Sequence, residues 1–414
     1  MSLETRHFLF LQAPHGPFFA QLGKALRTAG HVVSRVGFNA GDQFFWGRNP
    51  GYVAFQDEHD RWPAFFATLC TEKNITDLVL YGDVRAVHAQ ALAIAKVRGL
   101  RCHVFEEGYL RPYWVTYERN GSNGNSALMT LDFARIQGTK AMTDQDTGPP
   151  PAHWGDMREH VFYGALYHWW VMFRNGGYPH FRPHRALPVR AEAALYFRRM
   201  LLMPWLAIER HFANRRILNS AFPFHVVLMQ LEHDSSFQAH SDFQTMTCFF
   251  DLVLRGFAEG APQHHHLVFK AHPLENGRTA NKSAIFALAK KLGCQDRVHF
   301  LSGGKLARLL DQATSAVTIN STAGQQVLWR GLPLKIFGRA VYDKPTFVSD
   351  QTLSAFFAAP TYPDAEGYRA YRRFLLATSQ IPGGFYAARG RKQVLRQIVD
   401  KMIAAESPYD TFLK

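Results

Sequence analysis

Polar and charged side chains follow two apolar runs that we predict to be neighbouring β-strands. The run from His225 to Met229 is followed by one such group: Gln230, Glu232, His233, Asp234 and two serines. The run from Leu267 to Phe269 is followed by a second group: Lys270, His272 and Pro273. Open α/β sheets bind ligands at the carboxyl ends of their strands, so the pattern predicts a carboxylate beside a lysine and a histidine. Such a combination suits an anionic, phosphate-bearing substrate.

A plainer interpretation of the same residues is available. Polar residues after a strand also form ordinary solvated loops, and Pro273 is a common type of turn residue. However, the two runs lie about forty residues apart, which is the spacing of a strand, helix and strand unit. This spacing favours one shared site over two unrelated loops.

Hydroxyl and amide residues follow a third predicted strand, from Ser315 to Ile319. They precede a helix predicted to begin at Gln325, in the order Asn320, Ser321, Thr322, Ala323 and Gly324. Unpaired backbone N–H groups and the helix dipole make such a turn favourable for a phosphate. An ordinary N-cap explains Ser321 or Thr322 nearly as well.

Two adjacent carboxylates follow an earlier strand, predicted from Arg101 to Phe105. Glu106 and Glu107 precede Gly108, and in an extended chain their side chains point to opposite faces. At most one of them can point into a cleft, while the other can hold the turn by accepting backbone N–H groups. A carboxylate near apolar walls has a raised pKa and can act as a general base. The alternative is a solvated acidic turn.

The elements that position these groups alternate between strand and helix. Residues 7–37 predict a strand (His7 to Gln12), a helix (Phe18 to Ala29) and a second strand (His31 to Gly37). A further strand is expected from Asp77 to Tyr81. The alternation predicts a parallel, doubly wound sheet. The loop after Gln12, which includes Gly16, lies at the ligand end of the first strand and lacks the glycine fingerprint of dinucleotide sites.

Length and composition predict two domains and an anionic partner. A chain of 414 residues exceeds one ordinary core. Its boundaries are expected to be 1–150 for the first Rossmann-like domain, 151–220 for a helical linker, 221–345 for the second Rossmann-like domain and 346–414 for C-terminal helices. The formal charge of +14 indicates a nucleic acid, an acidic lipid surface or a phosphorylated substrate. No recognisable nucleic-acid motif accompanies the charge, so nucleic acid is not expected as a partner.

Cysteine usage and hydropathy bear on the compartment. The four cysteines are scattered without metal-type pairing, which fits a reducing cytoplasm. The N-terminus resembles a first strand and not a signal peptide. No apolar run approaches about 18 residues, so no membrane-spanning helix is expected. Three consecutive side chains, His264 to His266, cannot converge on one ion without a bent backbone, so no metal site is predicted.

The segment from Val161 to Leu218 is aromatic and arginine-rich, with stretches such as FYGALYHWWVMFRN and ALYFRRMLLMPWLAIERHFANRR. A basic helix that carries Trp and Phe can lie in a bilayer interface, where its arginines pair with acidic head groups. A pair of interdomain helices that buries its aromatics explains the composition equally well. The sequence leaves both interpretations open.

Taken together, these motifs resemble the capsular polysaccharide export protein KpsS family, which is related to the KpsC enzymes. The resemblance covers most of the chain, and its short motifs follow in order: FLQAPHGPFFAQLGKAL, FNAGDQFFW (Phe38 to Trp46), YGDVRAVH (Tyr81 to His88), FEEGYLRP (Phe105 to Pro112), QLEHDSS (Gln230 to Ser236), KAHP (Lys270 to Pro273) and INSTAG (Ile319 to Gly324).

The resemblance implies a GT-B-like α/β fold, with two Rossmann-type parallel-sheet domains facing a central cleft and C-terminal helices crossing back to the first domain. It implies a retaining glycosyltransferase that moves 3-deoxy-D-manno-octulosonic acid (Kdo) from CMP-Kdo to a phosphatidylglycerol-type lipid. This transfer would start the poly-Kdo linker of the capsule. The expected setting is the cytoplasmic face of the inner membrane of a Gram-negative cell, with KpsC-type enzymes and the capsule export machinery as partners.

The resemblance also assigns roles to residues of this chain. Asp234 would be the nucleophile, and Lys270 with His272 would neutralise the CMP phosphate. Glu106 would be the base by analogy with the acidic-acidic-glycine motif of bacterial sialyltransferases, with Glu107 as the alternative. The remaining donor-side residues would be Gln230, Pro273, Asn320, Ser321, Thr322 and Gly324. The acceptor side would contain Gln12, Gly16, Glu107 (which would shape its turn), Gly108 and Arg111. No cofactor or metal is expected, since these cations can stabilise the leaving phosphate.

Two alternatives remain at this stage. A transferase that uses CMP-sialic acid would carry the same acidic pair before glycine and the same His-Pro signal. A non-catalytic component of capsule export would bind capsule or lipid and would not bind CMP.

Overall fold

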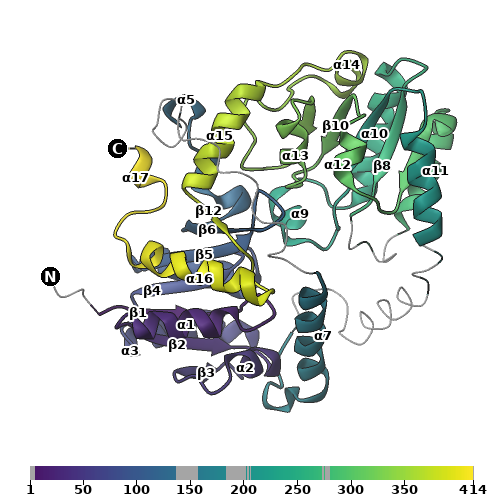
Figure 1. The fold of residues 1–414 in the computed structure, drawn as a ribbon. Coiled ribbons are helices and arrows are strands. Elements are labelled where there is room, and N and C mark those ends of the chain that lie inside the picture. The colour runs from purple at the N-terminus through teal and green to yellow at the C-terminus, as the bar shows by residue number, and fades with distance from the viewer. Residues whose placement is uncertain are drawn as a thin grey trace. The chain divides into compact units, whose positions relative to one another are not determined.

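The computed structural model describes residues 5–136, 157–182, 207–272 and 280–413, together with residues 202, 205 and 275. The chain divides into two compact units (Figure 1). Unit 1 contains residues 1–189 and 373–414, and unit 2 contains residues 190–372. The C-terminal segment therefore returns to the first unit, as predicted. The central cleft between the domains stays a prediction, and each unit is described by itself.

Unit 1 is built on a seven-stranded sheet with the order β12-β6-β5-β4-β1-β2-β3. Its strands are β1 (His7–Phe10), β2 (Val32–Gly37), β3 (Tyr52–Ala54), β4 (Asp77–Tyr81), β5 (Arg101–Glu107), β6 (Trp114–Arg119) and β12 (Gln380–Pro382). The five strands from β3 to β5 are parallel, which confirms the doubly wound prediction. The edge differs, because β6 is antiparallel to both β5 and β12. The sequence did not predict β3, β6 or β12, and β12 lies in a stretch expected to be mostly helical.

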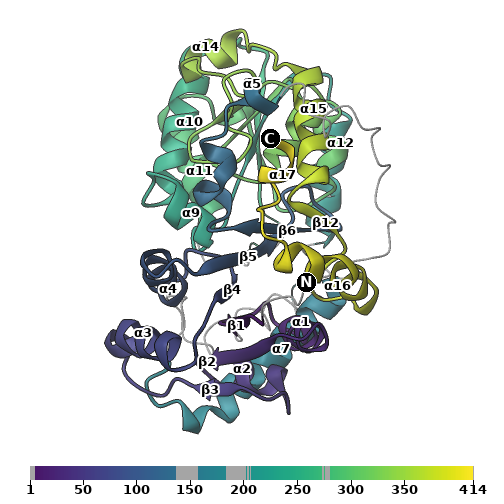
Figure 2. The ribbon, with the colours of Figure 1, turned by 90° about the vertical axis from the view of Figure 1, so that its left-hand side faces the viewer.

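Helices cover both faces of this sheet (Figure 2). The helices of unit 1 are α1 (Phe18–Thr28), α2 (Ala40–Trp46), α3 (Trp62–Glu72), α4 (Ala86–Val97), α5 (Phe133–Ile136), α7 (Met157–Phe173), α16 (Ala388–Ile403) and α17 (Asp410–Leu413). Alternate strand residues fill two cores, with Phe8 and Phe10 packing toward α1 and α16 and Leu9 packing toward α3 and α4. Because both faces are covered, the parallel strands are apolar on both sides.

A buried charge network lies at the amino-terminal end of β4, opposite to the strand ends at which the site is predicted. The Asp77 carboxylate, at the start of β4, accepts a hydrogen bond from Arg6 Nε at 2.8 Å and lies 2.8 Å from His103 Nε2 on β5. Arg6 also donates to the carbonyl oxygen of Met402 on α16 at 3.2 Å. The network therefore fixes the returning C-terminal helix to the sheet, away from the strand ends that carry the predicted site.

Unit 2 contains a five-stranded, fully parallel sheet with the order β11-β10-β7-β8-β9. Its strands are β7 (Phe224–Leu228), β8 (His266–Lys270), β9 (Val298–Leu301), β10 (Ser315–Thr318) and β11 (Leu334–Ile336). Its helices are α9 (Ser235–His240), α10 (Met246–Gly260), α11 (Asn281–Lys291), α12 (Leu306–Leu310), α13 (Gly324–Trp329) and α14 (Leu353–Ala358), and α15 (Ala365–Ala377) leads out of it. The predicted strands of this region are confirmed. The strand order reverses between β7 and β10, which makes their junction the topological switch point.

Short 3₁₀ turns complete the described structure: His59–Arg61, Asn123–Asn125, Ala127–Met129, Asn175–Gly177 and Gln295–Arg297. Among the described residues, no helix has both the length and the apolar character needed to cross a membrane. Part of the expected helical linker, 151–220, lies outside the described residues: 151–156, 183–201, 203, 204 and 206.

A buried histidine on β7 makes the stability of unit 2 depend on pH. His225 is fully buried, shares a 2.8 Å hydrogen bond with Ser315 Oγ on β10, and has its pKa lowered to about 3, first by burial and then by His265. The unfolded chain takes up this proton near its ordinary pKa of about 6.5. Stability is therefore fully present above that value and falls as the pH drops toward 3.

We expect His225 to contribute about 2 kcal/mol of destabilisation when the pH falls from 7 to 5. Urea unfolding of the wild type and His225→Gln at both pH values measures this loss, and the variant should show a correspondingly smaller pH difference. His264→Gln, which removes an exposed histidine, is the control. Equal pH dependence in the wild type and His225→Gln would contradict the assignment.

Candidate functional site

Three strands of unit 2 bring the predicted donor-side residues to one edge. β8, β7 and β10 are adjacent, and their register pairs Leu228 with both Lys270 and Thr318. The segments that follow these strands therefore begin at the same level of the sheet. They contain the three groups of polar residues that the sequence predicted. The structure thus places these groups at the carboxyl ends of neighbouring parallel strands, where α/β sheets bind ligands.

A pair of buried amides joins two of these segments across the switch point. Gln230 Nε2 donates to Asn320 Oδ1 at 2.7 Å, and the Asn320 backbone N–H donates to Gln230 Oε1 at 3.0 Å. Asn320 Nδ2 also donates to the carbonyl oxygens of Ser236 and His240, each at 3.0 Å. Both amides are 5% exposed. The pair therefore fixes the segment after β7, the start of α9 and the turn after β10 relative to one another.

The predicted nucleophile has a structural role in addition to any chemical one. Asp234 is the N-cap of α9, and its Oδ1 accepts a hydrogen bond from the Ser236 N–H at 3.3 Å. Glu232 acts similarly, because its Oε2 accepts the N–H of Met246 at the start of α10 at 2.9 Å. Both carboxylates are half-buried. The cap orients the Asp234 carboxylate at the edge that carries the cationic residues.

Lys270 supplies a buried amine at the end of β8. Its side chain is almost fully buried, and its Nζ donates to the Ala271 carbonyl oxygen at 3.2 Å. Burial, and after it the nearby charge of Arg210, lowers the pKa of Lys270 to about 8. His272 follows and is half-buried, whereas Pro273 lies outside the described residues. Lys270 therefore loses its charge at a pH well below that of an ordinary lysine.

The turn between β10 and α13 ends one residue earlier than predicted. α13 begins at Gly324, one residue earlier than expected, and spans only six residues, so its dipole is short. Ser321 Oγ accepts the Ala323 N–H at 3.2 Å, and the Tyr342 hydroxyl donates to the Ser321 carbonyl oxygen. A Cβ atom at Gly324 would lie 2.5 Å from the Tyr342 oxygen, which explains the glycine. Ser321 and Thr322 are half-buried, so their hydroxyls lie within reach of solvent.

The acidic pair of unit 1 lies within β5. Both glutamates are half-buried. Their hydrogen bonds differ from the prediction that Glu107 would accept a backbone N–H and so shape the turn. Glu106 Oε1 accepts the backbone N–H of Glu107 at 2.9 Å, a contact of the type expected for Glu107. Glu107 Oε1 instead accepts the hydroxyl of Tyr81 on β4 at 3.2 Å. The reason is that β5 continues through both residues, so the turn begins only at Gly108. Neither contact decides which glutamate is the base.

The other predicted acceptor-side residues lie after β1 and β5. Gln12 is buried; burial raises the pKa of the buried Asp42, and the Gln12 side chain acts more weakly to lower that pKa. Gly16 has a positive φ of 132°, and a Cβ there would lie 3.4 Å from the Tyr163 ring of α7. Gly108 donates its N–H to the Trp114 carbonyl oxygen at 3.0 Å, closing the β5–β6 hairpin. Arg111 is exposed, and its Nε donates to the Gly108 carbonyl oxygen at 3.3 Å.

Sequence reasoning missed a buried carboxyl pair beside this hairpin. Asp83, after β4, accepts the Ser122 N–H at 2.9 Å and Asn125 Nδ2 at 3.1 Å. Glu118 on β6 is fully buried and accepts a hydrogen bond from Ser126, and burial raises its pKa to about 7. Asp83 could have been recognised from the sequence, because Gly82 and Asp83 directly follow the predicted strand from Asp77 to Tyr81. Glu118 belongs to a strand that was not predicted, so no signal placed it here.

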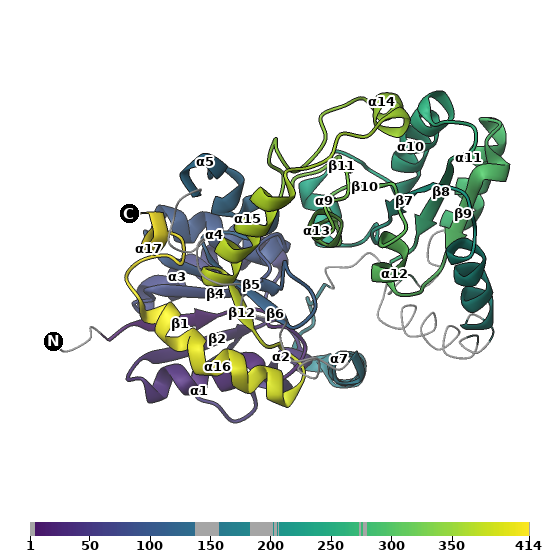
Figure 3. The same cartoon turned by 45° about the horizontal axis from the view of Figure 1, so that its top comes forward.

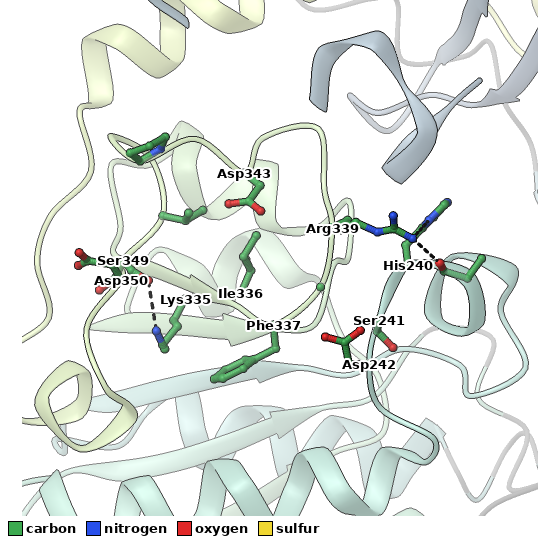
Figure 4. Close-up of a pocket in the computed structure, with 14 residues that line it drawn as sticks. His240, Ser241, Asp242, Lys335, Ile336, Phe337, Arg339, Asp343, Ser349 and Asp350 are labelled. Atoms are coloured by element: carbon green, nitrogen blue, oxygen red, sulfur yellow. Dashed lines mark hydrogen bonds between the residues drawn. The ribbon is translucent and has the colours of Figure 1, made fainter. Parts of the chain in front are cut away.

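A pocket of about 830 Å³ in unit 2 lies beside the predicted site (Figure 4). Its wall is formed by residues 239–242, 335–339, 343, 345 and 348–350, and none of the predicted site residues is among them. The pocket wall borders the donor-side edge, because Asn320 Nδ2 donates to the His240 carbonyl oxygen and the backbone N–H groups of Phe337 and Gly338 both donate to the Ile319 carbonyl oxygen. Within the part of the chain that the structure describes, no three His, Cys, Asp or Glu side chains form a candidate metal site.

The geometry defines a two-unit α/β protein whose second unit gathers a carboxylate, a lysine and hydroxyl groups at its switch point. Comparison with known proteins gives the family. The family described as capsule polysaccharide biosynthesis protein matches residues 76–386. The chain therefore belongs to the capsule polysaccharide biosynthesis protein family, and the predicted resemblance is confirmed.

Individual relatives cover nearly the whole chain. Capsule polysaccharide modification protein LipB of Neisseria meningitidis serogroup A is 33% identical over 397 residues, which cover 92% of each chain. Capsule polysaccharide export protein KpsS of Escherichia coli is 28% identical over 395 residues, which cover 93% of this chain and 98% of that protein. Thermosulfurimonas dismutans KpsC, a beta Kdo 2,7 transferase, aligns over 88% of this chain and 89% of its own, with 12% identity and a TM-score of 0.44.

The amide pair generates a stability prediction. Asn320→Ala removes three side-chain hydrogen bonds and leaves Gln230 Nε2 without its acceptor in a buried position. We expect unfolding to become easier by about 2–4 kcal/mol. Chemical denaturation measures the loss, and Thr322→Ala, two residues along the same turn, is the matched control. A loss below about 1 kcal/mol would show that the pair does not hold this edge together.

Proposed function

We propose that this protein is a retaining glycosyltransferase that moves β-Kdo from CMP-Kdo to a phosphatidylglycerol-type lipid, starting the poly-Kdo linker of a capsule. Membership of the capsule polysaccharide biosynthesis family supports a role in making capsule. The observation that carries the proposal is the placement of Asp234, Lys270 and Asn320 at the carboxyl ends of three adjacent parallel strands. This edge combines a nucleophile with groups that suit a nucleotide phosphate.

In the proposed first step, an Asp234 carboxylate oxygen attacks the anomeric carbon of Kdo while the bond from that carbon to the CMP phosphate oxygen breaks. The electron pair of that bond leaves with CMP. Lys270 and His272 neutralise the charge that develops on the phosphate, and Ser321 with Thr322 donates hydrogen bonds to it. The α9 cap suits this role because it fixes the direction of the attacking carboxylate.

In the second step, the acceptor hydroxyl attacks the same carbon and displaces Asp234. Glu106 takes the proton of that hydroxyl, which makes the oxygen a better nucleophile. Two displacements at one carbon give net retention. Glu106 is half-buried, which leaves its carboxylate partly accessible to a substrate. The protein's own cations carry the charge of the leaving group, so the proposed step includes no metal.

The proposed lipid acceptor determines where in the cell the protein would act. A lipid with a phosphatidylglycerol head group lies in a membrane, so we infer that the protein acts as a peripheral enzyme on the cytoplasmic face of the inner membrane. KpsC-type enzymes would then extend the first sugar, and the capsule export machinery would receive the product. The formal charge of +14 supports association with an acidic lipid surface.

Asp234→Asn tests the nucleophile without removing the helix cap, because Asn caps a helix about as well as Asp. With CMP-Kdo and a short-chain phosphatidylglycerol analogue, we expect transfer to fall by about 10³-fold or more while the thermal midpoint is preserved. Mass spectrometry of the wild type with donor alone should detect a Kdo adduct on the peptide that contains Asp234. Asp242→Asn, on the same unit but in the separate pocket, is the control.

Wild-type transfer rates in Asp234→Asn would overturn the nucleophile assignment. Transfer from CMP-sialic acid but not from CMP-Kdo would overturn the donor. A wild-type protein that binds no CMP and transfers neither sugar would be a non-catalytic capsule component.

The Lys270 pKa predicts how CMP binding depends on pH. This amine is charged below about pH 8 and neutral above it, so its attraction for the phosphate is lost as the pH rises. We expect the dissociation constant of CMP to rise by up to about tenfold between pH 7 and pH 9. Calorimetric titration measures the change. Lys270→Arg, whose guanidinium stays charged, should flatten the profile, and an equally steep profile in that variant would exclude Lys270 as the cause.

A further inference from the structure

Helix α7 of unit 1 is apolar on two opposite faces. Its inner face packs against the segment around α2 (Figure 3). Tyr167 accepts a hydrogen bond from Asn39 Nδ2 at 2.7 Å, and Trp170 stacks on Phe44 with ring centroids 4.6 Å apart. Tyr163 lies beneath the guanidinium of Arg391 on α16, 5.5 Å from its ring centroid. These contacts fix the helix and determine which side remains outward.

The outward side carries large apolar residues that are exposed in the described part of the chain. Val161 is 63% exposed, Phe162 61%, Trp169 44% and Phe173 60%. At 3.6 residues per turn, these four positions fall within about 120° of the helix circumference. We call them the outer stripe. A helix that is apolar all round is normally buried on all sides, so the outer stripe requires a partner.

The charges around the outer stripe indicate what that partner is. Arg158 at the start of α7 and Arg174 just after its end are exposed, and Arg182 follows as a third exposed cation. The only acid in the helix, Glu159, is half-buried and lies outside the arc of the outer stripe. An aromatic stripe that contains Trp and is flanked by arginines matches a bilayer interface with acidic head groups.

We propose that α7 lies in the plane of an acidic membrane and inserts the outer stripe among the acyl chains. The aromatic rings replace water contacts with lipid, while Arg158, Arg174 and Arg182 bind the head-group phosphates. The inner face stays packed on the protein, so the helix acts as a fixed edge of unit 1. This attachment needs neither donor sugar nor acceptor, and it therefore stands or falls separately from the transferase proposal.

The test is sedimentation of purified full-length protein with sucrose-loaded vesicles of phosphatidylcholine, with and without phosphatidylglycerol. The stripe variant is Phe162→Ser, Trp169→Ser and Phe173→Ser combined. The matched control removes three exposed apolar side chains elsewhere: Val97→Ser, Leu252→Ser and Tyr362→Ser. We expect the wild type and the control to bind vesicles that contain phosphatidylglycerol, and the stripe variant to bind at least about tenfold more weakly. Higher salt should weaken the wild-type binding, because the arginines contribute through charge.

Three results would overturn the proposal: a wild type that stays in solution at low salt, a stripe variant that binds like the wild type, and equal loss in the matched control. Light scattering without vesicles adds a fourth, since a dimer that the stripe variant abolishes would show that a second copy covers the stripe. Transfer to a short-chain soluble acceptor separates the two proposals. The stripe variant should retain that activity even when it no longer binds vesicles.

Discussion

The hydrogen-bonded amides Gln230 and Asn320 are the constraint on which the candidate donor site depends. They join the ends of β7 and β10 at the place where the strand order of unit 2 reverses. A parallel sheet leaves a crevice at this position, and its walls are loops that the sheet alone does not hold in place. Through Asn320, the same pair also reaches the backbone of α9 and thereby fixes the helix that Asp234 caps. The position of the proposed nucleophile is thus set by the hydrogen bonds of the amide pair.

Positive charge at the carboxyl edge of the unit 2 sheet comes mainly from side chains and not from helix dipoles. α13 is too short for a strong helix dipole, and the nearby acids already accept backbone N–H groups at helix N-termini. In the proposed site, Lys270, which is held in a buried environment, and His272 would supply the positive charge for a phosphate. Unit 1 uses its polar groups differently, since Glu106 and Glu107 are engaged within the sheet by a backbone N–H and by Tyr81.

The sequence predicted the parallel strands except the three-residue β3, because apolar runs such as β7 and β8 are buried on both faces and end abruptly in polar residues. It failed at the edge of unit 1. β6 carries the buried polar residues Thr116 and Glu118, and β12 has only three residues and lies among helices. The Gln230–Asn320 contact spans 90 residues and could not be derived from local pattern. The cap formed by Asp234 was readable in principle from the two serines that follow it.

Hydrogen–deuterium exchange of the full-length protein with and without CMP tests the central claim, that a nucleotide binds where β7, β8 and β10 end. The account predicts slower exchange on CMP addition at the described backbone amides of residues 230–236, 270–272 and 320–324. No slowing in these three segments, or slowing confined to the separate pocket around residues 335–350, would contradict it.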